Sequence, residues 1–126
     1  MDVFPRPLEL RALRVGEDGK RLWELLSPFD AVTSLGIITA PEGFLTDLAS
    51  VPRLLWASLS PFDDYLESAI PHDWGYSPLN DQFTRRQIDD MMLELMFNSG
   101  VSAIRRNAIY TTVRRFGARN YRGKLP

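Results

Sequence analysis

The chain has 126 residues, of which 44% are hydrophobic and 25% are charged, and its formal net charge is −1. These values are typical of a soluble globular protein, and we expect a single domain over residues 1–126 that builds its core without disulfides or metal. Because the chain contains no cysteine, disulfide scaffolds, zinc–thiolate sites and thiol nucleophiles are excluded. We expect no signal peptide and no transmembrane segment, since the sequence shows neither a leader pattern nor a run of about 18 apolar residues.

The charges are distributed unevenly along the chain. Residues 101–126 hold seven basic residues and no acidic one, whereas residues 1–100 hold the other eight basic residues and all 16 acidic ones. A basic end on an acidic body indicates either an acidic partner or packing of the basic end on the chain's own body. The partner would be an acidic protein face or an anionic membrane surface. Nucleic acid is not expected, because no recognisable reading module is present.

The first half of the chain predicts strands. Residues 8–15 and 20–26 flank a hairpin-type turn over residues 16–19, and short apolar runs follow at residues 36–39 and 44–46. We therefore expect a small antiparallel sheet in the N-terminal half.

The second half predicts three or four helices. A short helix is expected over residues 53–59, and another from Ser60-Pro61 to about Ile70. Pro71 has no N–H to donate and disfavours helix at the preceding residue, so a kink or break is expected just before His72.

The last two helices are delimited by capping residues. Thr84 and Gln87 have the spacing of a capping box, and Asn98-Ser99-Gly100 ends that helix. Ser102 caps a final helix that runs to about Phe116 and is closed by Gly117. An amphipathic stripe follows the capping box at Ile88, Met91, Met92, Leu95 and Met96. The fold class is therefore α+β, a small antiparallel sheet followed by three or four helices.

The only histidine lies in the run His72-Asp73-Trp74-Gly75-Tyr76. Histidine is the side chain whose unperturbed pKa changes its charge between about pH 5 and pH 8, so proton transfer would run through His72. Asp89 follows on the next long helix, and an antiparallel helix pair would let it hold His72 as a general base. The structural alternative is a helix-end histidine that is hydrogen-bonded to Asp89 or to a carbonyl.

Two further aspartates are candidate ligands for a hard cation. Asp73 points away from His72, since neighbours on a helix diverge by about 100°, and Asp47 lies in the loop after the predicted sheet. Carboxylates and loop carbonyls supply the oxygen ligands that Ca²⁺ prefers. An Asx-turn at Asp47 and an exposed or arginine-bound Asp73 are the structural alternatives. The Arg85-Arg86 pair is unfavourable at a helix start and is expected to serve a partner or an acidic side chain such as Asp73.

Several motifs, in their order along the chain, resemble a family of small proteins from tailed phages and prophages. That family is a domain of unknown function, DUF1353-like, so the resemblance implies a phage origin and supplies no activity. The resemblance rests on residues 41–53 (PEGFLTDLASVPR), the run from His72 to Tyr76, then Arg86, Asp89 and Met96, then Tyr110, Val113, Arg114, Phe116 and Gly117.

The pattern His72-Asp73-x-x-Tyr76 is similar to the His-Asp-x-x-Tyr helix of secreted phospholipases A2. That resemblance implies that His72 activates water and that Asp73 binds Ca²⁺. It also implies that Asp89 orients His72 and accepts a hydrogen bond from Tyr76. The chain departs from that family in having no cysteine and no glycine-rich calcium loop before the helix, although residues 43–47 stand in the right order to replace the loop.

Two functions follow from these observations. The first is a phage structural or accessory protein, tail- or virion-associated, that contacts other virion proteins and is found in the virion or, before assembly, in the host cytoplasm. The alternative is a Ca²⁺-dependent, phospholipase A2-like ester hydrolase with His72, Asp89 and Tyr76 as catalytic residues and Asp73 and Asp47 as metal ligands. The hydrolase requires one His72 ring nitrogen within about 3.2 Å of an Asp89 oxygen and the other nitrogen facing a cavity.

Overall fold

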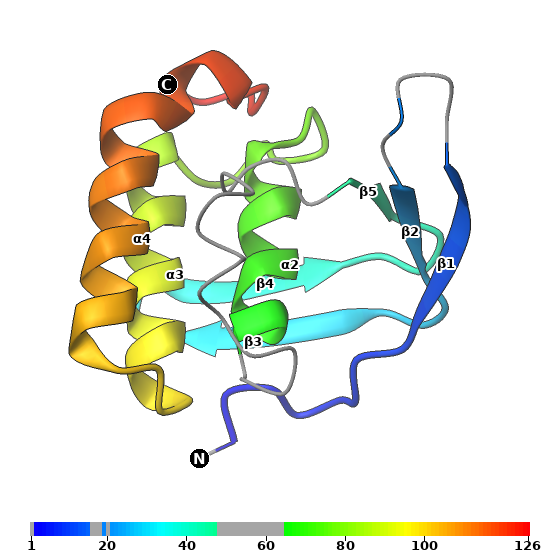
Figure 1. The fold of residues 1–126 in the computed structure, drawn as a ribbon, viewed down its shortest axis with the longest axis horizontal. Coiled ribbons are helices and arrows are strands. Elements are labelled where there is room, and N and C mark those ends of the chain that lie inside the picture. Colours follow the sequence, from blue (N-terminus) through cyan, green and yellow to red (C-terminus); the bar gives the residue numbers. More distant parts are fainter. Residues whose placement is uncertain (1, 16–18, 20, 48–64) are drawn as a thin grey trace.

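The computed structural model of the chain describes residues 2–15, 19, 21–47 and 65–126. Within these ranges, small antiparallel sheets in the N-terminal half are followed by three α-helices, which confirms the predicted α+β class (Figure 1). The helix predicted over residues 53–59 and the start of the helix predicted from Ser60 lie outside the described residues, as does most of the turn predicted over residues 16–19.

The strands form two sheets. β1 (Leu10–Val15), β2 (Arg21–Leu25) and β5 (Leu45–Thr46) make an antiparallel sheet in the order β1-β2-β5. β3 (Phe29–Thr33) and β4 (Gly36–Ala40) make a separate two-stranded hairpin. The sequence analysis did not predict β3, whose five residues include an aspartate, a residue type that is depleted in strands.

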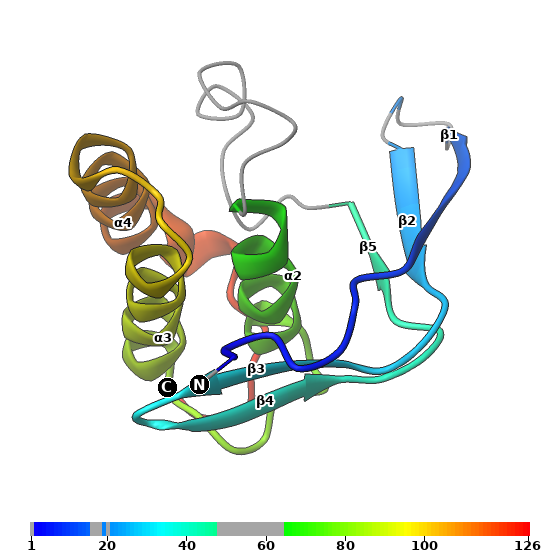
Figure 2. The same ribbon diagram turned by 90° about the horizontal axis from the view of Figure 1, so that it is seen from below.

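The helices are α2 (Tyr65–Tyr76), α3 (Arg85–Asn98) and α4 (Ala103–Phe116), followed by a short 3₁₀ helix, η1 (Gly117–Asn120). α4 ends at Phe116 with Gly117 as its C-cap, as predicted, and η1 follows directly. α2 and α3 pack on one face of the β3–β4 hairpin, and α4 packs on α3 on the side away from the hairpin (Figures 1 and 2).

The hairpin presents alternate residues to the helices, as expected for a sheet with one covered face. Phe29 pairs with Ala40 and Ala31 pairs with Ile38, and all four side chains are buried. Ile37 of β4 faces the other way and is 57% exposed. The core therefore lies between the hairpin and the two helices that cover it.

α2 runs through Pro71 to Tyr76, so the predicted break before His72 is wrong. A proline inside a helix removes one backbone hydrogen bond and costs about 3 kcal/mol. The helix continues because its second half is anchored by tertiary contacts: Ile70 and Trp74 are buried in the core, and His72 contacts Asp89 across the helix pair.

α3 begins and ends where the capping residues predicted. Thr84 Oγ1 accepts a hydrogen bond from the Gln87 backbone N–H, and Gln87 Oε1 accepts one from the Thr84 N–H, with N···O distances of 3.1 and 2.9 Å. The helix ends at Asn98. The predicted stripe is confirmed, since each of its members is at most 1% exposed: Ile88, Met91, Met92, Leu95 and Met96.

The C-terminal residues fold back over the loop between α2 and α3. The Arg122 N–H donates to the Tyr76 carbonyl and the Lys124 N–H donates to the Asn80 carbonyl, both with N···O distances of 2.8 Å. These bonds fix the basic end of the chain beside the C-terminal end of α2.

Gly75 marks the closest approach of α2 to α3, because a Cβ atom at this position would overlap the side chain of Ile88. We expect Gly75→Ala to lower the free energy of unfolding by about 1–3 kcal/mol through overpacking, even though alanine is the better helix former. Urea unfolding followed by circular dichroism measures the change.

The control for this variant is Thr111→Ala on the exposed side of α4. It should change the free energy of unfolding by less than about 0.5 kcal/mol. A Gly75→Ala protein as stable as the wild type would contradict the close approach of the two helices.

Candidate functional site

A buried carboxylate, Asp89, is the centre of a polar cluster between the three helices. Its side chain is completely buried on α3. Oδ1 contacts His72 Nε2 and accepts a hydrogen bond from the Tyr76 hydroxyl, each at 2.7 Å. Oδ2 accepts a hydrogen bond from Arg114 Nη1 at 2.6 Å and lies 3.5 Å from Arg85 Nη1. The cluster therefore joins α2, α3 and α4 through one side chain.

The surroundings keep Asp89 ionised. Burial alone would raise its pKa, but the hydrogen bonds and charge from His72, together with hydrogen bonds from Tyr76 and Arg114, lower that pKa below its usual value. Burial, followed by the charge of Asp89, raises the pKa of Tyr76 well above its usual value. Because an ionised carboxylate only accepts hydrogen bonds, His72 presents Nε2–H to it.

Arg85 and Arg114 balance the charge of Asp89. Arg85 Nη1 also donates to the Tyr76 hydroxyl at 3.3 Å and to the Val113 carbonyl at 3.1 Å, near the C-terminal end of α4. A cation is favourable at a helix C-terminus. Arg85 therefore serves an acidic side chain, as predicted, and that side chain is Asp89 rather than Asp73, the example that the sequence suggested.

Sequence reasoning did not place the two arginines of this cluster beside Asp89. The signal for Arg85 was its unfavourable place at a helix start, which indicated a nearby acid without saying which one. Arg114 had no local signal, since it lies 25 residues from Asp89 on a different helix.

Of the predicted site residues, His72, Asp89 and Tyr76 come together, and the His72–Asp89 distance of 2.7 Å meets the first requirement of a general-base dyad. Asp47 and Asp73 do not join this cluster. Both line a cavity of about 400 Å³, to which Tyr76 also contributes. His72 does not line this cavity, and its side chain is 0% exposed.

Asp47 and Asp73 lie at the same cavity, and their role as calcium ligands stays a prediction. Ca²⁺ takes about six to eight oxygen ligands, and the lining of the cavity includes Thr46, Ser77 and Asn120 besides the two carboxylates. Among the residues that the structure describes, no group of three or more His, Cys, Asp or Glu side chains could hold a metal ion. Arg122 lines the same cavity, and its positive charge disfavours the binding of a metal cation there. No step of a reaction is therefore assigned to a metal.

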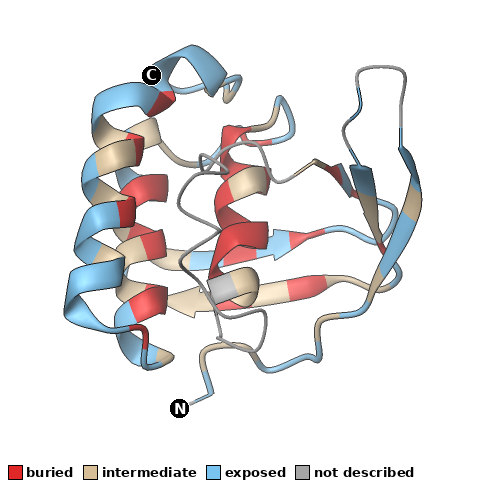
Figure 3. Ribbon diagram, in the orientation of Figure 1, coloured by how far each residue is buried: buried red, intermediate tan, exposed pale blue. Residues whose placement is uncertain are grey.

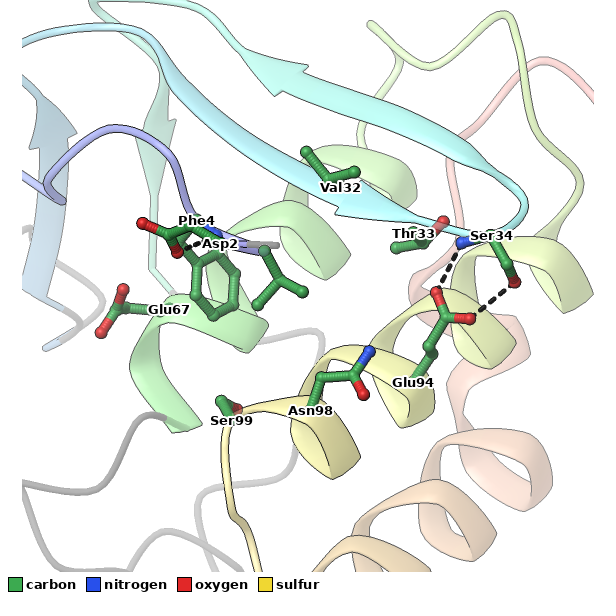
Figure 4. Close-up of a pocket in the computed structure, with 10 residues that line it drawn as sticks. Asp2, Phe4, Val32, Thr33, Ser34, Glu67, Glu94, Asn98 and Ser99 are labelled. Carbon is green, nitrogen blue, oxygen red and sulfur yellow. Dashed lines mark hydrogen bonds between the residues drawn. The ribbon is translucent and has the colours of Figure 1, made fainter.

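A larger cavity of about 830 Å³ lies between the N-terminal segment, β3 and the two helices that cover the hairpin (Figure 4). Glu94 in its wall accepts hydrogen bonds from the Ser34 backbone N–H at 2.7 Å and from the Ser34 hydroxyl at 2.6 Å. Asp2 accepts one from the Phe4 N–H at 3.0 Å. These acids hold the turn after β3 and the N-terminal segment, and the cavity contains none of the predicted site residues.

A family model described as "Protein of unknown function (DUF1353)" matches residues 23–113, more than half of the chain. The chain belongs to the DUF1353 family. The matched range contains His72, Asp89 and both aspartates of the smaller cavity, and it ends just before Arg114. No curated protein and no solved structure matches the chain. Since the DUF1353 description names no activity, function has to be argued from the molecule itself.

No helix in the described part of the chain combines the length and the apolar character needed to cross a membrane.

Asp89→Asn should destabilise the fold in a pH-dependent way. At neutral pH we expect a loss of about 3–5 kcal/mol in the free energy of unfolding, because the charges of Arg85 and Arg114 lose their buried counterion. The folded-state pKa of Asp89 lies below the unfolded value, so its contribution is complete above about pH 4 and is lost as the pH falls through the folded pKa.

Urea unfolding of both proteins from about pH 7 to about pH 3 measures this contribution, and the two stability curves should converge as the pH falls. Asp81→Asn, at an exposed position, serves as the control and should follow the wild-type curve. A stability gap that stays constant over the whole range would show that the Asp89 charge does not stabilise the fold.

Proposed function

We propose that this chain is a structural or accessory protein of a tailed phage or prophage, and that it acts through contacts with other virion proteins. The long motif resemblance to small phage proteins supports the origin. The contacts of Asp89 support a non-catalytic role, because they already engage His72 and Tyr76 in holding the helices together. The observation that carries the proposal is the exposed side of α4.

α4 packs on α3 through one side, on which Ile109 and Val113 are buried. The opposite side of α4 is exposed (Figure 3). It bears Ile104, Ala108, Thr111 and Arg115, spaced i, i+4, i+7 and i+11, and all four are exposed. We call these four residues the α4 outer face. Ile104, at the N-terminal end of this face, is a large apolar side chain that is 85% exposed.

Basic residues surround this face. Arg105 and Arg119 are exposed near its two ends, Arg115 belongs to it, and residues 101–126 contain no acid. Protein interfaces commonly combine an apolar centre with a polar rim, and complementary charge speeds association. The partner that fits is therefore an acidic protein surface with an apolar recess for Ile104.

The double substitution Ile104→Glu and Arg115→Glu should remove the protein from phage particles. Both side chains are exposed, so the variant should fold like the wild type while reversing the charge and polarity of the α4 outer face. We expect its abundance in purified particles to fall at least about tenfold, equivalent to about 1.4 kcal/mol of binding free energy. Quantitative mass spectrometry of particles from a prophage carrying each version measures this.

Leu79→Glu is the matched control, because Leu79 is 54% exposed but lies on the loop between α2 and α3. It should leave the abundance unchanged. Absence of the wild-type protein from the particles, or equal loss in both variants, would refute the proposed role of this face.

The contact between His72 and Asp89 favours ester hydrolysis as a second candidate. A carboxylate that holds Nε2–H orients the ring and stabilises the imidazolium that forms when Nδ1 takes a proton from water. Because the His72 side chain is fully buried, a substrate reaches Nδ1 only after neighbouring residues move.

The hydrolase candidate predicts that the protein releases fatty acid from phospholipid vesicles and that His72→Gln abolishes the release. The substitution removes the only imidazole, whereas Asp81→Asn at an exposed position should leave the rate unchanged. Release is measured with and without added Ca²⁺, since the hydrolase expectation included that ion. No release by the wild type under either condition would rule out the second candidate.

A further inference from the structure

The chain divides its charge between two parts. Residues 1–100 carry a net charge of −8 from eight basic and 16 acidic residues, whereas residues 101–126 carry seven basic residues and no acid. The basic part forms α4 and the C-terminal segment, while the larger cavity is built by the acidic part, from the N-terminal segment, β3, α2 and α3. One copy of the chain therefore presents a basic surface and an acidic one on different elements.

The larger cavity combines an apolar wall with acidic side chains. Val3, Phe4 and Val32 line it, and each is only half-buried, so part of its apolar surface stays accessible. Asp2 and Glu94 line it from opposite sides (Figure 4). The cavity is thus an apolar recess with acids at its edge, the arrangement that a basic surface with an apolar centre would fit.

The hydrogen bonds of these two acids do not balance their charge. Glu94 accepts from the backbone N–H and the hydroxyl of Ser34, and Asp2 accepts from the Phe4 N–H, and all of these donors are uncharged. Within the described ranges, neither carboxylate forms an ion pair. The bonds fix where the two carboxylates lie and leave their negative charge to act on a partner.

The apolar wall of the larger cavity is held in place. The Phe4 ring stacks on the ring of Phe29, which is fully buried, with centroids 5.5 Å apart. The Val32 N–H donates to the Val3 carbonyl at 2.9 Å, which ties the N-terminal segment to β3. A preformed surface lowers the entropic cost of binding.

The α4 outer face has the complementary features. Ile104 supplies an exposed apolar side chain at one end, Arg115 lies at the other, and Arg119 is exposed beyond it. A volume of about 830 Å³ is well above that of a single side chain, so the larger cavity has room for Ile104 and its neighbours on this face. Two α4 outer faces would oppose like charges, as would two acidic cavities, so the contact between unlike surfaces is favoured.

We propose that copies of this chain bind one another head to tail, with the α4 outer face of one copy seated on the larger cavity of the next. Ile104 lies against Phe4 and Val32, and the arginines of the basic part face the acids of the cavity. Such a contact uses different surfaces on the two copies, so it continues into a closed ring or an open filament. The inference rests on the proposed role of the α4 outer face as an interaction surface, and it names a second copy as the partner.

Sedimentation velocity of the full chain tests the association. We expect the wild type to associate with a Kd below about 100 μM. The α4 variant, Ile104→Glu with Arg115→Glu, and the cavity variant, Asp2→Lys with Glu94→Lys, should each raise that Kd at least about tenfold.

An equimolar mixture of the α4 variant and the cavity variant shows whether the contact is head to tail. Each variant keeps the surface that the other has lost, so the mixture should form a dimer and nothing larger. A contact between two α4 outer faces would instead leave the cavity variant associating like the wild type. Leu79→Glu and Asp81→Lys, at exposed positions, are the matched controls and should associate like the wild type.

Circular dichroism shows which variants are folded. Glu94→Lys removes the acceptor of the Ser34 hydrogen bonds, so Asp2→Lys alone, at an exposed position, replaces the cavity variant if the double substitution unfolds the chain.

The proposal is overturned if the wild type stays monomeric up to about 500 μM, or if a folded cavity variant associates as tightly as the wild type. A monomeric wild type that enters particles and is lost from them in the α4 variant overturns this inference alone, since the α4 outer face then binds another virion protein. Head-to-tail association in solution with no protein in the particles supports this inference and overturns the proposed function.

Discussion

One ionised carboxylate buried among three helices is the constraint on which the helical half of the molecule depends. An unpaired charge in a protein interior is costly, so Asp89 is tolerated only because partners from α2, α3 and α4 satisfy both of its oxygens. Each partner reaches it only when its helix has the observed register. The carboxylate therefore fixes the helix arrangement more specifically than the apolar packing of α3 does, since apolar contacts tolerate small shifts.

This constraint bears on whether His72 has a catalytic or a structural role. A histidine beside a carboxylate is the arrangement of a general base, and it is also what a buried carboxylate needs as a hydrogen-bond donor. Two observations separate these meanings here: the His72 side chain is fully buried, and Arg114 neutralises the carboxylate that would stabilise an imidazolium. The cluster is therefore better suited to holding helices than to moving protons in the conformation observed.

Local signals predicted much of the helical half, and the misses have tertiary causes. The Thr84–Gln87 capping box and the apolar stripe after it are encoded within a few residues, so α3 followed from the sequence. The short connection between α2 and α3 implied an antiparallel helix pair that brings Asp89 to His72, and the two side chains are in contact. The passage of α2 through Pro71 did not follow, because it depends on burial against other elements. Arg114 was missed for the same reason, since its partner lies on another helix.

The same cluster shapes the cavity beside it. Tyr76 lines the smaller cavity and its hydroxyl donates to Asp89, so the buried carboxylate also fixes the position of one lining residue of that cavity. The backbone of Tyr76 in turn accepts the Arg122 N–H, which brings the basic C-terminal segment to the opposite wall. Asp73 lies next to His72 in sequence but lines the cavity, since neighbouring residues on a helix diverge by about 100°, whereas His72 is buried beside Asp89.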